Sequence, residues 1–357
     1  MTTPMTNPRV ALVALTTTGA AGEYVAGLAD ALGRRAIVRV WLPDRPPITT
    51  STAEQRTFPK AGTRGAVAWR EASSWLHPSP IAREAREWAA DVVHVVFGEG
   101  YPTAARMCRD LASQGTSAVA TWHDPQPHGQ PLDRVQHAVA ARTMRSVAGV
   151  HIHCAELVPT EFQRKALVAE HPAFACSLCP DHTTTLPLRT DGAIFTAGRF
   201  APYKGVDELC AALDAYWRSG GNRAFEVVGQ GKVPSSLRRL ETSWPTSVRI
   251  TNEYVSTTAL HDALSKAAVC VMPYLSATQS ALPWLARMHG AHLIATDVGC
   301  IGGMARRLGA RVVPPGDVNK LVDALHEPPG MWTDVGRMPL PTFDALADRL
   351  LEWYPTL

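Results

Sequence analysis

The sequence is poor in charge and has no long apolar run. Charged residues make up only 19% of the 357 residues, against about 25% in typical soluble domains, and the formal net charge is +3. So small a charge excludes the strongly basic surface that binds nucleic acid or anionic membranes. No segment reaches the roughly 18 consecutive apolar residues that a membrane helix needs. We therefore expect neither a nucleic-acid partner nor an integral membrane segment.

Cysteine is also sparse, with seven residues in the chain, which excludes a disulfide-stapled scaffold. The first nine residues carry one positive charge and two prolines instead of the apolar stretch of a secretory signal, so we expect a cytoplasmic protein with reduced thiols. Cys176 and Cys179, with His171 and His182 nearby, supply one cysteine pair, whereas structural zinc normally takes four ligands in two close pairs. We expect buried or free thiols here and no metal.

Apolar residues, in contrast, make up 46% of the chain, which excludes wholesale disorder. They form short strand-like runs that alternate with longer helical patterns. The run 10–15 is followed by a break, a helical pattern over 23–32 and a second run over 37–42, and this start predicts a parallel sheet. The segment 49–80, rich in Pro, Ser, Thr and Gly, is expected to be irregular and to carry variable ligand-binding residues, because such residues concentrate on loops over a rigid scaffold.

The alternation runs through the first half of the chain and restarts near residue 191. Because 357 residues exceed one compact core, we predict an α/β protein with two Rossmann-like, doubly wound domains facing a cleft. The first domain is expected over 1–185 and the second over 186–339. A helix over 340–357 is expected to cross back to the first domain.

Parallel sheets bind ligands at the carboxyl ends of their strands, and one such loop carries charge. The sequence T-A-G-R-F-A-P-Y-K-G over 196–205 lies between a predicted strand and a predicted helix. Gly198 lets the backbone turn closely, and Arg199 and Lys204 place two cations near the amino end of the helix. That arrangement suits a diphosphate, although taken alone it also fits a solvated basic turn.

Further loops of the second half follow in a fixed order. They read V-V-G-Q-G from 227, M-P-Y from 272, S-A-T-Q-S from 276, A-T-D-V-G from 295 and V-P-P-G-D from 313. Together with 196–205, they resemble the carboxyl-terminal domain of retaining, nucleotide-sugar-dependent glycosyltransferases with the GT-B fold, family 4 type. Members commonly read G-R-x-x-x-x-K-G, V-x-G-x-G, A-T-D-V-G-G and P-P-G-D, and the match covers about 194–325.

The resemblance implies roles for individual residues of the second half. Arg199 and Lys204 would be catalytic, because they would stabilise the leaving diphosphate. The other expected donor-binding residues of this half are Gly198, Gly229, Thr278, Gln279, Ser280 and Ala281. The donor would be a co-substrate, and we expect no separate cofactor. No Asp-x-Asp motif is evident, so we expect a metal-independent reaction.

The first half resembles the same family more loosely. Gly19 and Gly22 lie in a glycine-containing turn after the first strand, where backbone N–H groups could meet the donor phosphates. The sequence H-D-P begins at His123, and in the family this histidine contacts the donor sugar. We assign His123 a catalytic role, and Asp124 and His128 contacts to sugar or acceptor. A structural histidine–aspartate turn is the alternative explanation.

The chain departs from the family at two positions. Members usually carry two glutamates, and Ala277 and Leu285 stand where these are expected. The second glutamate usually binds the ribose hydroxyls, and a buried diol that loses such a partner costs about 1–3 kcal/mol. We therefore expect a deoxyribonucleotide donor such as a dTDP-sugar, unless another residue or water binds the ribose.

The sequence thus predicts retaining transfer of a sugar from a nucleotide diphosphate to an acceptor hydroxyl. The Ala-, Arg- and Pro-rich composition resembles that of high-GC actinobacterial proteins, which suggests a specialised metabolite such as an aminoglycoside, or a cell-envelope glycan, as acceptor. The alternative is a non-catalytic GT-B partner that activates or positions another transferase. The sequence does not indicate an oligomeric state.

Overall fold

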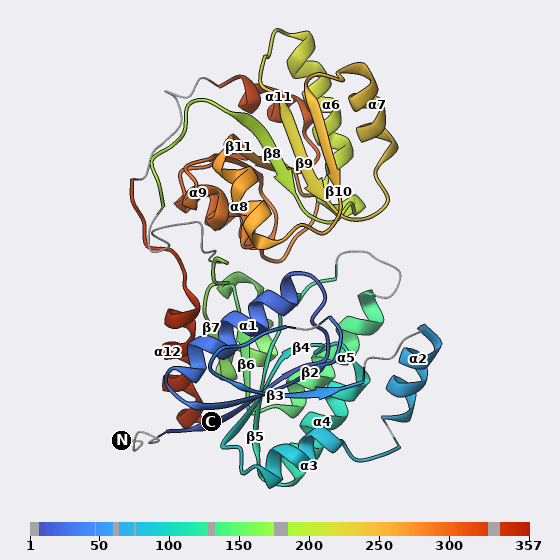
Figure 1. The fold of residues 1–357 in the computed structure, drawn as a ribbon, viewed down its shortest axis with the longest axis vertical. Coiled ribbons are helices and arrows are strands. Elements are labelled where there is room, and N and C mark those ends of the chain that lie inside the picture. Colours follow the sequence, from blue (N-terminus) through green and yellow to red (C-terminus); the bar gives the residue numbers. More distant parts are fainter. Residues whose placement is uncertain are drawn as a thin grey trace. The chain divides into compact units, whose positions relative to one another are not determined.

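The computed structural model describes residues 7–46, 48–59, 64–74, 76–127, 133–174, 185–327 and 336–357. The chain divides into two compact units. Unit 1 is Met1–Glu170 with Thr342–Leu357, and unit 2 is His171–Pro341. Each unit is built on one parallel sheet with helices packed against it (Figure 1). Within the described ranges, no helix has the length and apolar character needed to cross a bilayer.

Unit 1 contains a seven-stranded sheet in the order β3-β2-β1-β4-β5-β6-β7. Its strands are β1 (Arg9–Ala14), β2 (Ile37–Pro43), β3 (Glu54–Phe58), β4 (Val92–Phe97), β5 (Ser117–Thr121), β6 (Gly149–Ile152) and β7 (Ala166–Val168). Its α-helices are α1 (Ala20–Gly33), α2 (Arg64–Ser73), α3 (Pro80–Glu87), α4 (Pro102–Ser113), α5 (Asp133–Ser146) and α12 (Phe343–Trp353). Helices cover the central strands, so β1 is almost wholly buried and its sequence is apolar after Arg9.

The segment 49–80 is more regular than its composition indicates, and the expectation of an irregular segment is wrong. It contains β3 and α2. Strand β3 reads E-Q-R-T-F and pairs only with β2, at the edge of the sheet. Edge strands often carry charged side chains because one side faces water. The strand therefore lacks the apolar pattern by which the other strands are recognised.

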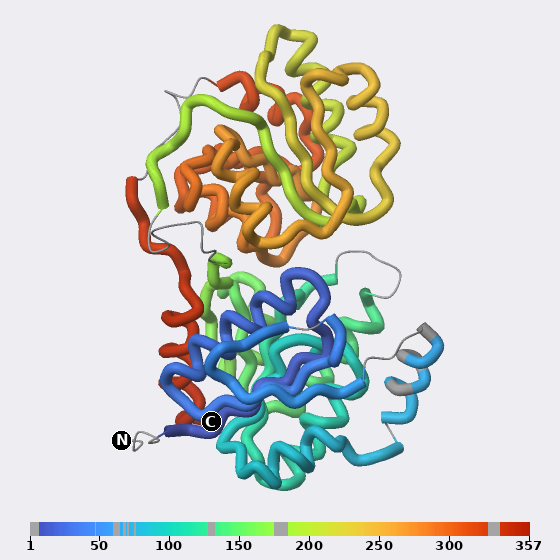
Figure 2. The backbone as a smooth tube through the Cα atoms, in the orientation of Figure 1, coloured from blue at the N-terminus to red at the C-terminus, as the bar shows by residue number. Residues whose placement is uncertain are grey.

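The carboxyl-terminal helix α12 packs against α1 within unit 1, as Figure 2 shows for the red and blue ends of the tube. A Cβ at Gly27 of α1 would lie 2.6 Å from the Phe343 ring, so glycine is what lets the two helices approach. Arg35 forms ion pairs with Asp344 and Asp348, each at 2.6 Å. The helix is therefore held to unit 1 by both packing and charge.

Unit 2 contains a six-stranded sheet in the order β10-β9-β8-β11-β12-β13. Its strands are β8 (Ala193–Ala197), β9 (Phe225–Gly229), β10 (Val248–Asn252), β11 (Ala267–Met272), β12 (His292–Thr296) and β13 (Arg311–Val313). Its α-helices are α6 (Val206–Arg218), α7 (Ser235–Ser243), α8 (Thr257–Ser265), α9 (Leu282–Met288), α10 (Gly299–Arg307) and α11 (Val318–His326). Apolar residues of α6, α7 and α11 form one core with the sheet.

Two buried histidines make unit 2 sensitive to acid. Burial lowers the pKa of His171 to about 4, and burial together with the charge of Arg287 lowers the pKa of His292 to about 3. Unfolding restores ordinary values near 6.5, so the unfolded state binds more protons between pH 6.5 and about 4. Stability is therefore fully present above pH 6.5. Below that pH, the unfolding free energy of unit 2 should fall by up to about 2.7 kcal/mol per pH unit.

Urea unfolding of unit 2 between pH 7.5 and 4.5 measures this dependence. The variant His292→Leu removes one of the two titrating groups, so the slope should fall by about half even if its absolute stability differs. A slope that is the same in the variant and the wild type would contradict the assignment to His292.

Candidate functional site

The strand order of unit 2 reverses between β8 and β11. From β8 the chain moves outward through β9 to β10, and it then returns to build β11, β12 and β13 on the other side of β8. Loops that leave such a pair of strands diverge, and the crevice at their carboxyl ends is where open α/β sheets bind ligands. Arg199 and Lys204 follow β8, and the predicted Thr278–Ala281 loop follows β11. The fold thus brings the main predicted donor residues to neighbouring strand ends.

Two glycines let the ends of β8 and β9 approach each other. Gly198 has a φ of +138°, which side chains disfavour. Its N–H donates to the Val228 carbonyl oxygen at 2.9 Å. A Cβ at Gly229 would lie 2.2 Å from the Gly198 oxygen, so any larger residue would separate the strand ends. Arg199 follows this turn and is exposed, and its guanidinium makes no hydrogen bond or ion pair with another described residue.

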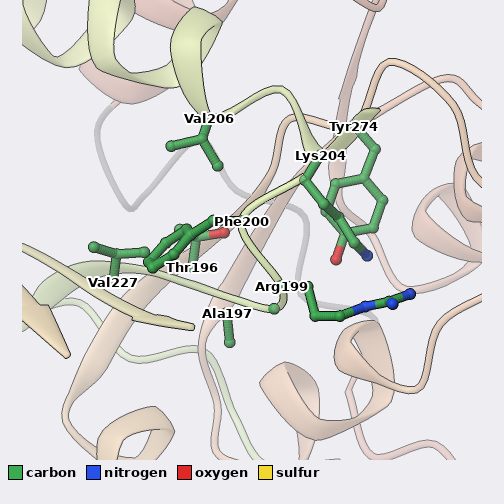
Figure 3. A pocket seen from close by; sticks show the side chains of 9 residues that line it. Thr196, Ala197, Arg199, Phe200, Lys204, Val206, Val227 and Tyr274 are labelled. Atoms are coloured by element: carbon green, nitrogen blue, oxygen red, sulfur yellow. The ribbon is translucent and has the colours of Figure 1, made fainter. Parts of the chain in front are cut away.

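Lys204 ends a short 3₁₀ turn, Pro202–Lys204, before α6. Its Nζ lies 3.7 Å from the centroid of the Tyr274 ring. Figure 3 shows Lys204 and Tyr274 together on one side of the loop and Phe200 and Val227 on the other. The pocket at this point is lined by Thr196, Ala197, Gly198, Arg199, Phe200, Lys204, Val206, Val227 and Tyr274. Both predicted catalytic cations of unit 2 therefore line one pocket.

The loops after β8 and β11 are joined directly through the backbone. Gly205 has a φ of +66°, and a Cβ there would lie 1.8 Å from the Pro273 carbonyl oxygen. The Leu275 N–H donates to the Tyr203 carbonyl oxygen at 2.8 Å. The position of Lys204 is consequently fixed by the β11 loop as well as by its own.

The Thr278–Ala281 loop lies between β11 and α9. Thr278 is buried, and its carbonyl oxygen accepts a hydrogen bond from the Cys300 N–H at the start of α10 at 3.1 Å. The Ser280 hydroxyl accepts from the Leu282 N–H at 3.2 Å. The Gln279 Oε1 atom is buried without a hydrogen-bond partner. Such an atom costs about 1–3 kcal/mol, which a ligand donor would offset.

Ala277 and Leu285, which stand where the resemblance leads us to expect glutamate, are buried and apolar. Ala277 is 7% exposed and its carbonyl oxygen packs against Gly299, while Leu285 is 2% exposed within α9. Neither side chain can accept a hydrogen bond. The structure therefore offers no carboxylate at these two positions.

Unit 1 has its own reversal of strand order, between β1 and β4. After β1, Gly19 takes a φ of +65° and caps α1, and its carbonyl oxygen accepts from the Gly22 N–H at 3.1 Å. A Cβ at Gly22 would lie 2.8 Å from the Thr17 carbonyl oxygen. The tight turn thus explains why both positions are occupied by glycine. A contact with the donor phosphates at this turn remains a prediction.

His123 follows β5 and is 5% exposed. Its ring stacks on Phe97 with centroids 3.9 Å apart, and its Nε2–H donates to the Val96 carbonyl oxygen at 2.9 Å. This bond fixes the tautomer and uses one ring nitrogen structurally. Asp124 beside it is exposed. The predicted residue His128 lies outside the described residues, as do Cys176, Cys179 and His182.

Glu99, which was not identified from the sequence, follows β4 at the reversal point of unit 1. Its Oε1 accepts a hydrogen bond from the His123 N–H at 3.2 Å, so it joins the loops after β4 and β5. Burial, together with the charge of Asp124, raises the pKa of the Glu99 carboxyl to about 7, although several backbone N–H groups act to lower it. An available signal was the sequence F-G-E-G-Y, which places an acid between glycines directly after an apolar strand.

Residues 191–327 match a protein family described as "Glycosyl transferases group 1". The matched region lies within unit 2 and contains both cations and the Thr278–Ala281 loop. No curated protein sequence matches the chain.

Solved structures with similar folds cover nearly the whole chain. The catalytic domain of starch synthase IV from Arabidopsis thaliana, bound to ADP and acarbose, is 13% identical over 99% of each chain, with a TM-score of 0.67. Sucrose-phosphate synthase from Thermosynechococcus elongatus is 15% identical over 98% of this chain and 95% of its own, with a TM-score of 0.66.

A UDP-forming trehalose-phosphate synthase from Burkholderia xenovorans, in complex with glucose-6-phosphate, is 11% identical. The match covers 98% of this chain and 96% of that chain, with a TM-score of 0.63. The two parallel sheets and these whole-chain similarities confirm the predicted α/β, GT-B fold.

Proposed function

We propose that the protein is a retaining glycosyltransferase that moves a sugar from a nucleotide diphosphate to an acceptor hydroxyl. The observation that carries this proposal is the pocket at the β8–β11 reversal point, where Arg199 and Lys204 follow one strand end and Tyr274 follows the other. The match of residues 191–327 to group 1 glycosyl transferases supports it.

The chemistry of the pocket suits a leaving diphosphate. As the glycosidic bond to the donor phosphate breaks, negative charge builds up on the diphosphate oxygens, and cations held in place before the reaction stabilise that charge. Lys204 is held by the two joined loops, and Arg199 stands exposed beside it. These side chains can supply the stabilisation without a metal ion. Asp207 and Glu208 lie in the first turn of α6, and their negative charge opposes anion binding at the helix end. The two cations are therefore the principal anion-binding groups.

The donor we propose is a dTDP-sugar. Leu285 occupies the position of the glutamate that would accept hydrogen bonds from the ribose hydroxyls, and it is buried. A deoxyribose has one hydroxyl fewer to satisfy, so it loses less than a ribose at such a site. The Gln279 Oε1 atom lacks a hydrogen-bond partner. We propose that it accepts a hydrogen bond from a remaining polar group of the sugar nucleotide.

For the acceptor, we propose a specialised metabolite such as an aminoglycoside, based on the composition of the chain. In unit 1, the loops with Gly19, Gly22, His123 and Asp124 stand at or next to the strand-order reversal. We propose that the Gly19–Gly22 turn serves the donor phosphates and that the His123–Asp124 loop serves the acceptor and the transferred sugar, with Glu99 joining the two loops after β4 and β5.

Calorimetric titration of the purified chain with UDP, GDP and dTDP tests the donor. We expect dTDP to bind most tightly. Preference for a ribonucleotide would refute the deoxyribose proposal alone, whereas failure of all three to bind would refute the nucleotide-sugar site itself.

A non-catalytic GT-B partner protein is the second candidate, and the buried apolar side chains of Ala277 and Leu285 favour it. The two candidates differ in whether the chain alone turns over a bound donor. We expect the isolated chain to release nucleoside diphosphate from the sugar nucleotide that it binds, at least slowly by hydrolysis. Donor binding without any turnover, with turnover appearing only when a second transferase is added, would favour the partner protein.

A further inference from the structure

Tyr274 is fixed by three separate contacts directly after β11. The residue is 2% exposed. Its carbonyl oxygen accepts a hydrogen bond from the Thr296 hydroxyl at 2.5 Å, and its own hydroxyl is hydrogen-bonded to Ser280. Its ring lies beneath the Lys204 ammonium at 3.7 Å from the centroid (Figure 3). Backbone, hydroxyl and ring therefore each contact a different part of the site.

The contact with Lys204 is electrostatic as well as steric. An aromatic face carries negative charge density and attracts an ammonium within about 6 Å, more strongly where water is excluded. Lysine has a long flexible side chain, and holding it in one position normally opposes binding entropically. A buried ring at 3.7 Å reduces this loss, because it confines the ammonium before any ligand arrives.

The contact with Ser280 extends the same residue to the Thr278–Ala281 loop. Burial raises the pKa of the Tyr274 hydroxyl, so the group stays neutral and keeps its hydrogen. The Ser280 hydroxyl also accepts from the Leu282 N–H, which places it at the start of α9. Tyr274 thus connects the loop that carries Lys204 to the loop that carries Ser280.

We propose that Tyr274 is a positioning residue that holds the Lys204 ammonium toward a bound diphosphate through its ring and sets the Thr278–Ala281 loop through its hydroxyl. This inference rests on the proposed function, because it assigns to the same pocket a diphosphate ligand. A tyrosine that merely fills space would be replaceable by any ring of equal size.

Reversing the charge distribution of the aromatic face without changing the ring size separates an electrostatic role of the ring from a merely space-filling one. Phenylalanine at position 274 keeps the negative aromatic face, whereas pentafluorophenylalanine has nearly the same shape and a reversed face. We expect Tyr274→Phe to bind inorganic pyrophosphate within about twofold of wild type, and the pentafluorophenylalanine protein to bind it about 3- to 30-fold more weakly. In a Lys204→Met background the difference should disappear.

The hydroxyl is tested by turnover. Tyr274→Phe should lower turnover of the sugar nucleotide several-fold while leaving pyrophosphate binding nearly unchanged, and Ser280→Ala should cause a smaller further loss in that variant than it causes in the wild type. Full additivity of the two substitutions would overturn the link to Ser280.

The outcomes also separate this inference from the proposed function. Wild-type protein that binds neither pyrophosphate nor a nucleoside diphosphate would contradict the proposed site. Wild-type binding that depends on Lys204 but is equal for the phenylalanine and pentafluorophenylalanine proteins would overturn only the role of the Tyr274 ring.

Discussion

Lys204→Met should lower the rate of sugar transfer by about 100-fold or more, the usual effect of removing one fixed charge that stabilises a transition state. Methionine keeps much of the side-chain length and removes the charge. Lys204 is held against Tyr274 by loops that are joined at Gly205, so its charge is fixed in place before the reaction. Arg199→Met should have a smaller effect, about tenfold, because an exposed charge acts through water.

The matched control for both variants is Arg218→Met. Arg218 lies in the last turn of α6, at the opposite end of the helix that Lys204 precedes, and forms an exposed ion pair with Asp214. Exposed ion pairs contribute little, so this variant should stay within about twofold of wild type in kcat. Measured kcat and KM for all three variants test the assignment. Activity within threefold of wild type for both Lys204→Met and Arg199→Met would show that neither cation serves the leaving group.

Gly205→Ala should destabilise unit 2 by about 3 kcal/mol or more. Two effects add at this position. The backbone has a φ of +66°, which costs a residue with a Cβ about 1–2 kcal/mol, and the new Cβ would lie 1.8 Å from the Pro273 carbonyl oxygen. Backbone atoms on both sides have to move, so the β8 and β11 loops should separate. Pyrophosphate binding should weaken along with stability, because Lys204 precedes this residue directly.

Gly220→Ala separates the two effects. Gly220 lies just after the other end of α6, has a φ of +97°, and a Cβ there would meet nothing within 4 Å. In this variant the free energy of unfolding should fall only by the cost of the left-handed backbone, about 1–2 kcal/mol. Its affinity for pyrophosphate should be retained. Denaturant unfolding with a titration of each variant makes the comparison. Equal losses at the two glycines would mean that the contact with Pro273 does not hold the loops together.

Some features of the fold were predictable because burial leaves a clear pattern. Strands β1 and β4 lie between covering helices, so apart from Arg9 and His94 their residues are apolar, and the runs can be recognised in the sequence. Strand β3 pairs on one side only and has an exposed, charged sequence, so the same reasoning missed it. A continuous apolar run marks a strand only where both of its faces are covered.

The candidate site divides in a similar way. Arg199 and Lys204 could be identified because they lie in one loop with a recognisable order of residues. Glu99 and Tyr274 could not be assigned roles, because their partners are far away in the sequence: Glu99 contacts the backbone of His123, and Tyr274 contacts Lys204, which is 70 positions earlier. The raised pKa of Glu99 also arises from burial, which follows only from packing.

The sequence by itself determined the alternation of strands and helices, the parallel sheets and the identity of the two cations, because each depends on residues close together along the chain. The tertiary structure decided which loops meet. Strand order places the ends of β8 and β11 side by side, and the missing side chain at Gly205 lets their backbones touch. The position of a charge in space depends on such long-range contacts, and these contacts set what the pocket can bind.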